Sequence, residues 1–297
     1  MITYNLVFAF DEGYAQHFCV AYYSLLENNK NLDFNTYVLH GKISNKTKSI
    51  LDNFSASFHR EIEFIYIDDE KFSGLVTGYH FKKSSYYRLL IPEVVNGDKV
   101  LYLDSDIIVN ASIKELFDID ISDYYLAAVG GAEFNRHEEL KMSGDAKYFN
   151  SGVMLINVRK WVDSSLHKKA IRFAEEHPNA IKFVDQCALN SVVNGEWLSL
   201  SPIWNQQTAF FERDRFDYFS EQEIKNALNH PTIIHYTGSS KPWQYMNDHP
   251  YKYLYWHYLK KTPYRNYRHE DYSLINAIKK YTPDPIKQFI KEAISIK

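Results

Sequence analysis

Cysteine, glycine and proline are all scarce in this sequence. Its 297 residues include two cysteines, 11 glycines and 9 prolines, which excludes a disulfide-stapled scaffold, a collagen-like chain and a low-complexity chain. Cys19 and Cys187 both fall in helix-like patterns and could form one long-range disulfide. Two reduced thiols in the core of an intracellular protein fit this low usage better. The net charge of −3 gives no reason to expect nucleic acid as the main partner.

Long apolar runs are also missing. No stretch approaches the ~20 apolar residues that a membrane-spanning helix needs. The apolar run near the N-terminus, residues 4–10, is short and has no basic flank, unlike a signal peptide. We therefore expect a cytoplasmic protein. The hydrophobic content of 45% is enough for one large domain, with or without an appended C-terminal piece.

Strand-like and helix-like segments alternate along the first hundred residues. The predicted strands are residues 5–10, 35–39, 62–67 and 99–103, and the predicted helices are 14–28, 44–54 and 84–90. Strands separated by helices predict right-handed crossovers and a mostly parallel α/β sheet of the nucleotide-binding type, with ligands beyond the carboxyl ends of the strands. The later pattern is mixed, with strands predicted at 126–129, 152–157, 196–200 and 232–235 and helices at 158–173 and 185–193.

Two acidic residues stand inside an apolar, strand-like run at residues 100–109. Asp104 and Asp106 are two positions apart, and residues at that spacing in an extended chain point to the same face. Burying ionised carboxylates is costly unless they are paired or coordinate a metal. The spacing predicts a site for a hard divalent cation such as Mg²⁺ or Mn²⁺, which commonly shares its ligands with substrate phosphates. A strand that simply ends in a polar turn at Asp104 is the alternative.

A late strand is followed by the polar segment His-Tyr-Thr-Gly-Ser-Ser-Lys-Pro-Trp at residues 235–243. His235 could coordinate a metal, Gly238 allows close backbone approach, and Lys241 offers a charge to a phosphate. A histidine that ends a strand is, taken alone, more often structural. Together with the two aspartates it completes two oxygen ligands and one nitrogen ligand for Mn²⁺, with diphosphate oxygens in the other positions.

Further polar residues stand beside apolar runs. Asp11, at the turn from the first strand to the first helix, could accept the imide N–H of a uracil while Tyr14 stacks on the base, although an aspartate there is more often a helix N-cap. Asp185 and Gln186 begin a helix, where Asp185 could also be a cap. Asn150 precedes a buried strand and could aim its amide at a hydroxyl-rich ligand.

Taken together, these segments resemble family 8 of the glycosyltransferases, retaining enzymes of the GT-A fold, and are most similar to its bacterial galactosyltransferase and glucosyltransferase branch. The matching segments follow the family's order and spacing: residues 8–14, 86–89, 99–109, 149–161, 185–190 and 235–243. The resemblance implies a Rossmann-like, nucleotide-sugar-binding fold and a hexosyltransferase that uses UDP-glucose or UDP-galactose.

The resemblance also implies a role for each candidate residue. Mn²⁺, or Mg²⁺ in its place, would be held by Asp104, Asp106 and His235 and would bind the UDP diphosphate. The uracil would contact Asp11 and Tyr14, and the phosphates Gly238 and Lys241. The donor sugar would contact Arg88, Asp185 and Asn150. Ser105 and Thr237 complete the substrate-binding set, and the catalytic residues would be Asp185 and Gln186, with Gln186 near the anomeric carbon.

Retention of configuration could proceed by double displacement or by attack on the same face of the sugar. Gln186 is a neutral amide and a poor nucleophile, which favours same-face attack, with the departing phosphate deprotonating the acceptor hydroxyl. The expected acceptor is a cell-surface glycan, as in lipooligosaccharide, capsule or glycoprotein. Gly130 and Gly131 stand where a galactosyltransferase of the family has an acidic acceptor contact, which Glu133 could replace, so acceptor identity is open.

Two other functions compete with this interpretation. An apolar strand followed by Asp-x-Asp also opens the HAD-type phosphatases, but these need a later acidic pair that this sequence lacks. A catalytically inactive carbohydrate-binding homologue is the second alternative. It is disfavoured because such a protein has no need to keep every metal and phosphate ligand.

The C-terminal part differs in composition from the rest. Residues 241–297 contain eleven Lys and Arg against five Asp and Glu, and ten tyrosines or tryptophans lie between Tyr245 and Tyr281. Residues 285–297 place apolar side chains on one helical face and charged ones on the other. We expect a catalytic domain at 1–244 and a helical extension at 245–297. Its last helix either packs back on the domain or lies on the anionic inner face of the plasma membrane.

Overall fold

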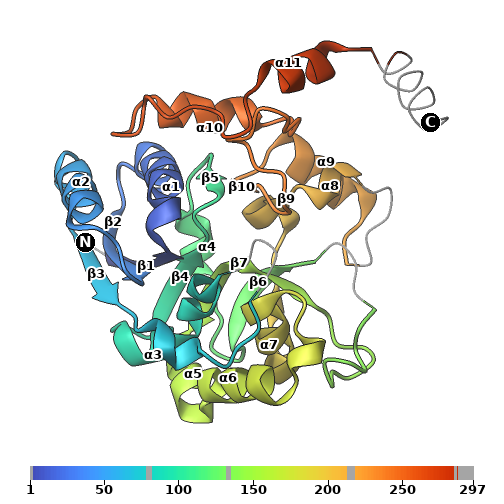
Figure 1. Cartoon of the computed structure of the whole chain (residues 1–297). Helices are drawn as coiled ribbons and strands as arrows, with labels where there is room; N and C mark the ends of the chain where they lie inside the picture. Colours follow the sequence, from blue (N-terminus) through green and yellow to red (C-terminus); the bar gives the residue numbers. More distant parts are fainter. Residues whose placement is uncertain (1–2, 78–81, 132–134, 213–217, 284–285, 287–297) are drawn as a thin grey trace.

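Seven strands form the central sheet, in the order β3-β2-β1-β4-β7-β6-β8 (Figure 1). The computed structural model describes residues 3–77, 82–131, 135–212, 218–283 and 286. The seven strands are β1 (Thr3–Phe10), β2 (Asp33–His40), β3 (Ile62–Tyr66), β4 (Lys99–Leu103), β6 (Leu126–Gly130), β7 (Phe149–Asn157) and β8 (Leu198–Ser199). Four of the neighbouring pairs are parallel, and the two that involve β7 with β4 and β6 are antiparallel. The predicted mostly parallel α/β sheet is therefore confirmed.

Chain order reverses beside β1. From β1 the chain moves outward to β2 and β3, and it then returns to add β4 on the other side of β1. β1 pairs in parallel with both neighbours, so the carboxyl ends of β1 and β4 lie next to each other. Such a switch point opens a crevice at the end of the sheet, which is where ligands bind in sheets of this type.

Helices cover both faces of the sheet (Figure 1). One face carries α1 (Ala15–Asn28) and α2 (Asn45–Ala56), and the other carries η3 (Lys83–Leu90), α3 (Ile91–Val94), α5 (Val158–Ser164), α6 (Leu166–Glu176) and α7 (Val184–Val193). Alternate residues of β1 contribute to the two cores. Leu6 and Phe8 pack on the side of α1, whereas Val7 packs on the side of η3. β1 and β4 are apolar on both faces because both faces are covered.

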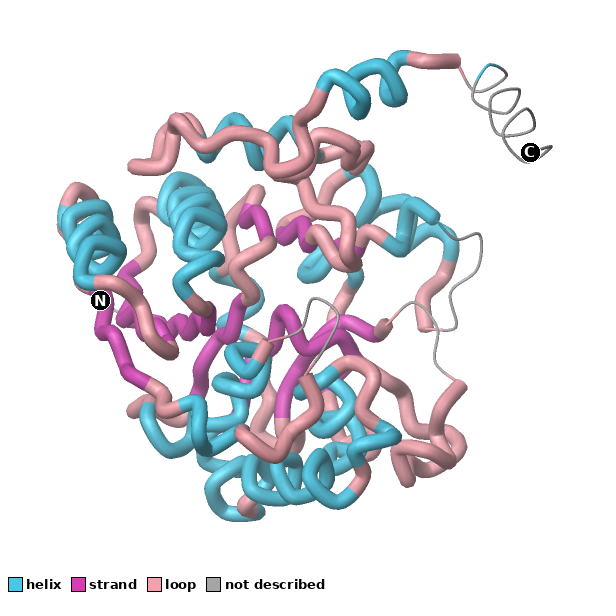
Figure 2. The backbone as a smooth tube through the Cα atoms, viewed as in Figure 1, coloured by secondary structure: helices cyan, strands magenta, loops and turns pink. Residues whose placement is uncertain are grey.

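A second, three-stranded sheet lies beside the first (Figure 2). Its strands are β5 (Ile107–Val109), β10 (Ile233–His235) and β9 (Gln206–Gln207), with β10 in the middle. The run at residues 100–109 is therefore not one continuous strand. β4 ends at Leu103, the backbone N–H of Asp104 still donates to the Gly152 carbonyl at 2.8 Å, and the chain then crosses to the second sheet at Ile107.

Several predicted elements differ in detail. The helix predicted at 158–173 is broken at Ser165, whose positive φ of 53° separates α5 from α6. The helix predicted at 84–90 is a 3-10 helix, and the strand predicted at 196–200 is shortened to the two residues of β8. Both cysteines are buried and free, as predicted. The remaining elements are η1 (Glu12–Tyr14), η2 (Asp69–Phe72), α4 (Lys114–Asp118), η4 (Pro178–Ala180), η5 (Pro202–Asn205), α8 (Ala209–Glu212) and α9 (Glu221–Asn229).

The aromatic segment after residue 243 packs on α1 through α10 (Lys252–Leu259). His17 of α1 stacks on Trp243 with ring centres 3.5 Å apart, and its Nδ1 lies 2.7 Å from the Tyr255 hydroxyl. By contrast α11 (Leu274–Tyr281) extends away from the body of the protein (Figure 1). Within the described residues no helix combines the length and hydrophobicity required to span a bilayer. The predicted amphipathic helix at 285–297 lies outside the described residues, apart from residue 286.

The buried ring of His17 predicts a pH dependence of stability. Burial lowers the pKa of His17 from 6.5 to about 3, so between these pH values the unfolded chain binds a proton that the folded chain does not. Each such proton costs about 1.4 kcal/mol of stability per pH unit as the pH falls through this interval. His17→Gln should therefore flatten the fall in unfolding free energy between pH 6.5 and 4, measured by urea denaturation. The exposed His230→Gln is the matched control, and equal slopes in wild type and His17→Gln would contradict the prediction.

Candidate active site

All thirteen candidate site residues line one pocket beyond the carboxyl ends of β1 and β4. The pocket has a volume of about 300 Å³, enough for part of a small-molecule ligand. Ser84, Ser85, Ser151 and Gly152 also line it and were not among the candidates. The candidates are Asp11, Tyr14, Arg88, Asp104, Ser105, Asp106, Asn150, Asp185, Gln186, His235, Thr237, Gly238 and Lys241.

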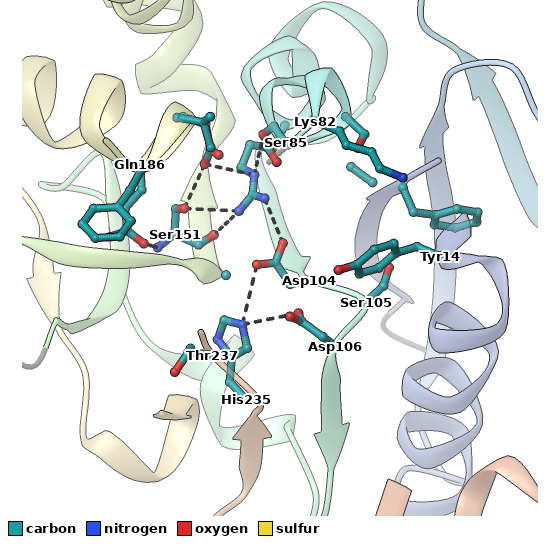
Figure 3. A pocket seen from close by; sticks show the side chains of 18 of the residues that line it. Tyr14, Lys82, Ser85, Asp104, Ser105, Asp106, Ser151, Gln186, His235 and Thr237 are labelled. Atoms are coloured by element: carbon teal, nitrogen blue, oxygen red, sulfur yellow. Dashed lines mark hydrogen bonds and ion pairs between the residues drawn. The ribbon is translucent and has the colours of Figure 1, made fainter. Parts of the chain in front are cut away.

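Asp104, Asp106 and His235 converge on one point of the pocket (Figure 3). One potential ligand atom from each lies within 4.8 Å of the others. His235 Nε2 is 3.4 Å from Asp106 Oδ1 and 3.7 Å from Asp104 Oδ2. The pairing of β10 with β5 produces this arrangement, because it places His235 opposite Ile107, the residue after Asp106. Two carboxylates and one imidazole form a donor set suited to a hard or borderline divalent cation.

Gly152 leaves the room that such a cation would need. A Cβ at this position would overlap the His235 ring and lie 2.6 Å from Asp104 Oδ2. Any larger residue at position 152 would therefore fill the space between the candidate ligands. The three ligands and this clearance fit a divalent cation.

Two basic side chains balance the carboxylates of the pocket. Lys241 Nζ lies 2.5 Å from Asp106 Oδ2 and also donates to the Tyr236 carbonyl at 2.6 Å. Arg88 is buried and lies 2.9 Å from Asp104 Oδ1 and 3.2 Å from Asp185 Oδ2. Although burial opposes ionisation, Lys241 and His235 hold the pKa of the Asp106 carboxyl well below its usual range.

Asp185 is the most enclosed carboxylate of the site. It is 2% exposed and accepts a hydrogen bond of 2.8 Å from Ser151 Oγ in addition to its ion pair with Arg88. Burial raises its pKa to about 6 even though Arg88 acts in the opposite direction. Val184, the residue before it, has a positive φ of 32°, an unfavourable conformation for a β-branched residue. Strain of this kind is commonly concentrated at functional sites.

The Gln186 amide is held at both ends. Its Oε1 accepts the backbone N–H of Ser151 at 3.1 Å, and its Nε2 donates to the Tyr148 hydroxyl at 3.1 Å. Because the Ser151 N–H can only donate, the orientation of the amide is determined. A group restrained in this way, and lacking a charge, is suited to positioning a substrate rather than to nucleophilic attack.

Asp11 serves as the N-cap of η1, which is the structural role that the sequence favoured. Its Oδ1 accepts the Gly13 N–H at 2.9 Å and the Lys82 ammonium at 3.0 Å, and its Oδ2 accepts from Ser84 Oγ at 3.3 Å. The carboxylate nevertheless lines the pocket, as does Tyr14, whose ring makes a T-shaped contact with Trp243. Capping and ligand binding are therefore compatible at Asp11.

The remaining candidates come from two loops. Ser105, between the two aspartates, is buried, and its hydroxyl has no hydrogen-bond partner among the described residues. Thr237 Oγ1 accepts the Thr208 N–H at 3.1 Å. Gly238 has a φ of +85°, which favours glycine, and an added Cβ there would meet no atom within 4 Å. Backbone conformation rather than crowding therefore accounts for Gly238.

Asn205 of η5 was missed in the sequence although it touches two candidates. It is fully buried, and it contacts His235 Nδ1 and Asn150 Oδ1, both at 2.9 Å. The sequence does contain a signal for this site: three consecutive amide residues follow a tryptophan, in Trp-Asn-Gln-Gln at 204–207. Glu133, named as a replacement acceptor contact, lies outside the described residues.

A seven-stranded α/β sheet with an Asp-Asp-His cluster at its switch point has the arrangement expected of a GT-A glycosyltransferase. The family model described as "Glycosyl transferase family 8" matches residues 5–247. The chain belongs to glycosyltransferase family 8. Membership of this family excludes the HAD-type phosphatase alternative.

Individual relatives agree with the family. General stress protein A of Bacillus subtilis is 32% identical over 267 residues, which cover 87% of this chain and 93% of that protein. Glycosyltransferase GlyF of Streptococcus pneumoniae is 31% identical, over 86% of this chain and 61% of its own length. A lipopolysaccharide 1,2-glucosyltransferase of Escherichia coli is 28% identical, over 81% and 73% of the two chains.

Solved structures show the same fold. The galactosyltransferase LgtC, in a complex with donor and acceptor sugar analogues, superposes with a TM-score of 0.79 at 25% identity and covers 87% of this chain and 96% of its own. Glycosyltransferase GlyE of Streptococcus pneumoniae superposes with a TM-score of 0.67 at 27% identity, over 87% and 60% of the two chains. The GT-A assignment is therefore confirmed.

Gly152→Ala should remove binding of a divalent cation, because the added methyl group occupies the space between His235 and Asp104. We expect destabilisation of about 1–3 kcal/mol from overpacking and at least a tenfold loss of Mn²⁺ affinity, measured by electron paramagnetic resonance of free Mn²⁺. Gly144→Ala is the matched control, since a Cβ there meets no atom within 4 Å. Unchanged Mn²⁺ affinity in a folded Gly152→Ala protein would contradict the assignment of this space to a cation.

Proposed function

We propose that this protein is a retaining hexosyltransferase that transfers glucose or galactose from a UDP-sugar to a cell-surface glycan and depends on Mn²⁺, with Mg²⁺ as a possible substitute. The observation that carries the proposal is the convergence of Asp104, Asp106 and His235 beside Lys241 in one pocket. Family 8 membership supplies the reaction class. The donor, the metal and the acceptor are the new parts of the proposal.

The nucleotide would occupy the end of the pocket formed by Asp11 and Tyr14. The Asp11 carboxylate can accept the imide N–H of uracil through Oδ2, which accepts one hydrogen bond from Ser84 Oγ, whereas Oδ1 already accepts two. The Tyr14 ring, in T-shaped contact with Trp243, would stack on the base. Cytosine presents no N–H at the matching ring position, so this arrangement favours uracil.

The diphosphate would lie between the cation site and Lys241. A cation bound by Asp104, Asp106 and His235 would neutralise charge that develops on the leaving diphosphate. Lys241 would add its charge to a phosphate oxygen, and Gly238 would let the backbone approach it closely. Ser105 and Thr237 also line this pocket. These groups would be in place before the reaction, which is how enzymes gain most electrostatic stabilisation.

The donor sugar would contact Arg88, Asn150 and Asp185. During transfer the bond from the anomeric carbon to phosphate breaks, the acceptor oxygen bonds to the same face, and the acceptor proton passes to the departing phosphate. The restrained amide of Gln186 supports this route over double displacement, because both of its ends are already hydrogen-bonded. Asp185, ionised above its raised pKa of about 6, would stabilise positive charge at the anomeric carbon.

The acceptor is proposed to be a lipooligosaccharide, a capsular glycan or a glycoprotein. Two relatives are lipopolysaccharide 1,2-glucosyltransferases of Escherichia coli, which supports a surface glycan as the acceptor class. A catalytically inactive carbohydrate-binding homologue is the second candidate, and the metal and nucleotide measurements below distinguish it.

We further propose a catalytic domain at residues 1–244 and an extension at 245–297 that attaches a cytoplasmic enzyme to the inner face of the membrane. On α11 the apolar residues Leu274, Ile275 and Ile278 are 65–76% exposed, and the exposed Lys279 lies in its last turn. An apolar face beside a lysine is suited to an anionic membrane interface. The acceptor would be presented at the same surface.

Ile275→Glu/Ile278→Glu should weaken attachment to vesicles of anionic phospholipid without lowering turnover on a soluble acceptor. Both side chains are exposed, so the change adds repulsive charge without disturbing the core. Co-sedimentation with vesicles measures the effect, and Thr282→Glu on the same segment is the control for charge alone. Equal sedimentation of the wild type and the double variant would show that this face does not bind the membrane.

Asp106→Asn should abolish glycosyl transfer and Mn²⁺-dependent binding of UDP while the protein stays folded. The change removes one charged ligand from the cation site but preserves side-chain volume. Isothermal titration of UDP-glucose and UDP-galactose, each with and without Mn²⁺, measures binding and identifies the donor. The exposed Asp52→Asn serves as the control.

Two outcomes would overturn the proposed function. Activity of Asp106→Asn within a few-fold of the wild type would remove the role of the cation site. Absence of Mn²⁺-dependent binding of either UDP-sugar to the folded wild type would favour another nucleotide or the inactive homologue.

A further inference from the structure

We propose that Asn205 is a positioning residue that determines both the tautomer of His235 and the orientation of the Asn150 amide. The inference rests on the proposed function, since His235 is a proposed cation ligand and Asn150 a proposed sugar ligand. Asn205 is fully buried at the end of η5 and does not line the pocket. It therefore acts through its two neighbours and makes no contact with substrate.

A chain of hydrogen bonds joins β7 to β10 through this residue. The backbone N–H of Gly152 donates to Asn150 Oδ1 at 3.0 Å. Asn205 Nδ2 donates to the same oxygen at 2.9 Å, and Asn205 Oδ1 lies 2.9 Å from His235 Nδ1. The chain links three segments that are far apart in the sequence.

The direction of every bond in this chain follows from its first member. A backbone N–H can only donate, so the atom of Asn150 that faces Gly152 must be the carbonyl oxygen. The Asn205 atom that meets this oxygen must then be its amide nitrogen. The other end of Asn205, which faces His235 Nδ1, is consequently a carbonyl oxygen and requires a proton on Nδ1. No choice of side-chain amide orientation is left open.

Both consequences serve the site. With the Nδ1 proton donated to Asn205, His235 can present the Nε2 lone pair toward Asp104 and Asp106, as a metal-binding imidazole must. With its oxygen engaged by Gly152 and Asn205, Asn150 is left with an N–H₂ group for the pocket that it lines. A donor toward the pocket suits a sugar hydroxyl or a phosphate oxygen.

The position requires one donor and one acceptor on a short side chain. Aspartate could accept from His235 but would place a second acceptor against Asn150 Oδ1. Alanine would leave the buried His235 Nδ1 without a partner, at a cost of about 1–3 kcal/mol, and Asn150 Oδ1 would keep only the Gly152 N–H. The two substitutions therefore separate the two roles of Asn205.

The experiment compares Asn205→Ala and Asn205→Asp with the wild type. Mn²⁺ affinity is measured in the presence of UDP by electron paramagnetic resonance, and the affinities for UDP and for the UDP-hexose are measured by titration. Gln207→Ala is the matched control, because Gln207 is also a buried amide in the same segment but donates to the Gly130 carbonyl at 3.0 Å. Thermal unfolding of all four proteins reports folding.

Asn205→Ala should lose about 10–100-fold in Mn²⁺ affinity, the usual effect of removing the partner of a metal-binding histidine. Asn205→Asp should keep Mn²⁺ affinity within a few-fold of the wild type, because a carboxylate also accepts the Nδ1 proton. The same variant should lose up to about tenfold in affinity for the UDP-hexose relative to UDP, the value of one hydrogen bond.

Two results would overturn the inference alone. The first is an Mn²⁺ affinity of Asn205→Ala equal to that of Gln207→Ala. The second is a loss of Mn²⁺ and sugar affinity in equal proportion in Asn205→Asp, as general structural damage would cause. Failure of the wild type to bind Mn²⁺ with UDP would instead overturn the proposed function, and this inference with it.

Discussion

Compensation among buried charges is the constraint on which the site depends. Asp104, Asp106 and Asp185 are brought together at the end of the sheet, where mutual repulsion and burial both oppose ionisation. Arg88 lies between Asp104 and Asp185, and Lys241 pairs with Asp106. Removing one partner from such a network leaves an uncompensated buried charge, which is far more costly than a lost surface ion pair. The two basic residues therefore hold the site together as well as serving the proposed donor.

The fold makes this arrangement possible by joining distant segments at one place. Asp104 follows β4 of the large sheet, and His235 ends a strand of the small sheet more than a hundred residues later. Antiparallel pairing of β5 with β10 sets the register that brings His235 to Asp106. β7 contributes Gly152, whose missing side chain leaves the ligands room to meet. Main-chain geometry thus positions most of the chemistry, and side-chain hydrogen bonds refine it.

Much of this was predictable from the sequence, and the exceptions share a physical cause. Asp104, Asp106 and His235 stand at the ends of apolar strands, so local pattern alone indicated a common site. The break at Ser165 depends on a left-handed conformation that most serines do not adopt, and no local signal announces it. Asn205 gains its importance from partners 30 and 55 positions away, which no short window contains. Long-range contacts, rather than local propensity, determine the roles of such residues.

The division of the apolar run between two sheets has a mechanical consequence. Asp104 belongs to the end of the large sheet, whereas Asp106 and His235 belong to the small one. A cation held by all three would act as a cross-link between the two sheets, comparable to a removable staple. Binding of the cation would then restrain the relative motion of the two sheets. Removal of the cation by a chelator would loosen the contact between the sheets before either sheet unfolded. The small sheet would be the part of the molecule that senses whether the cation is present.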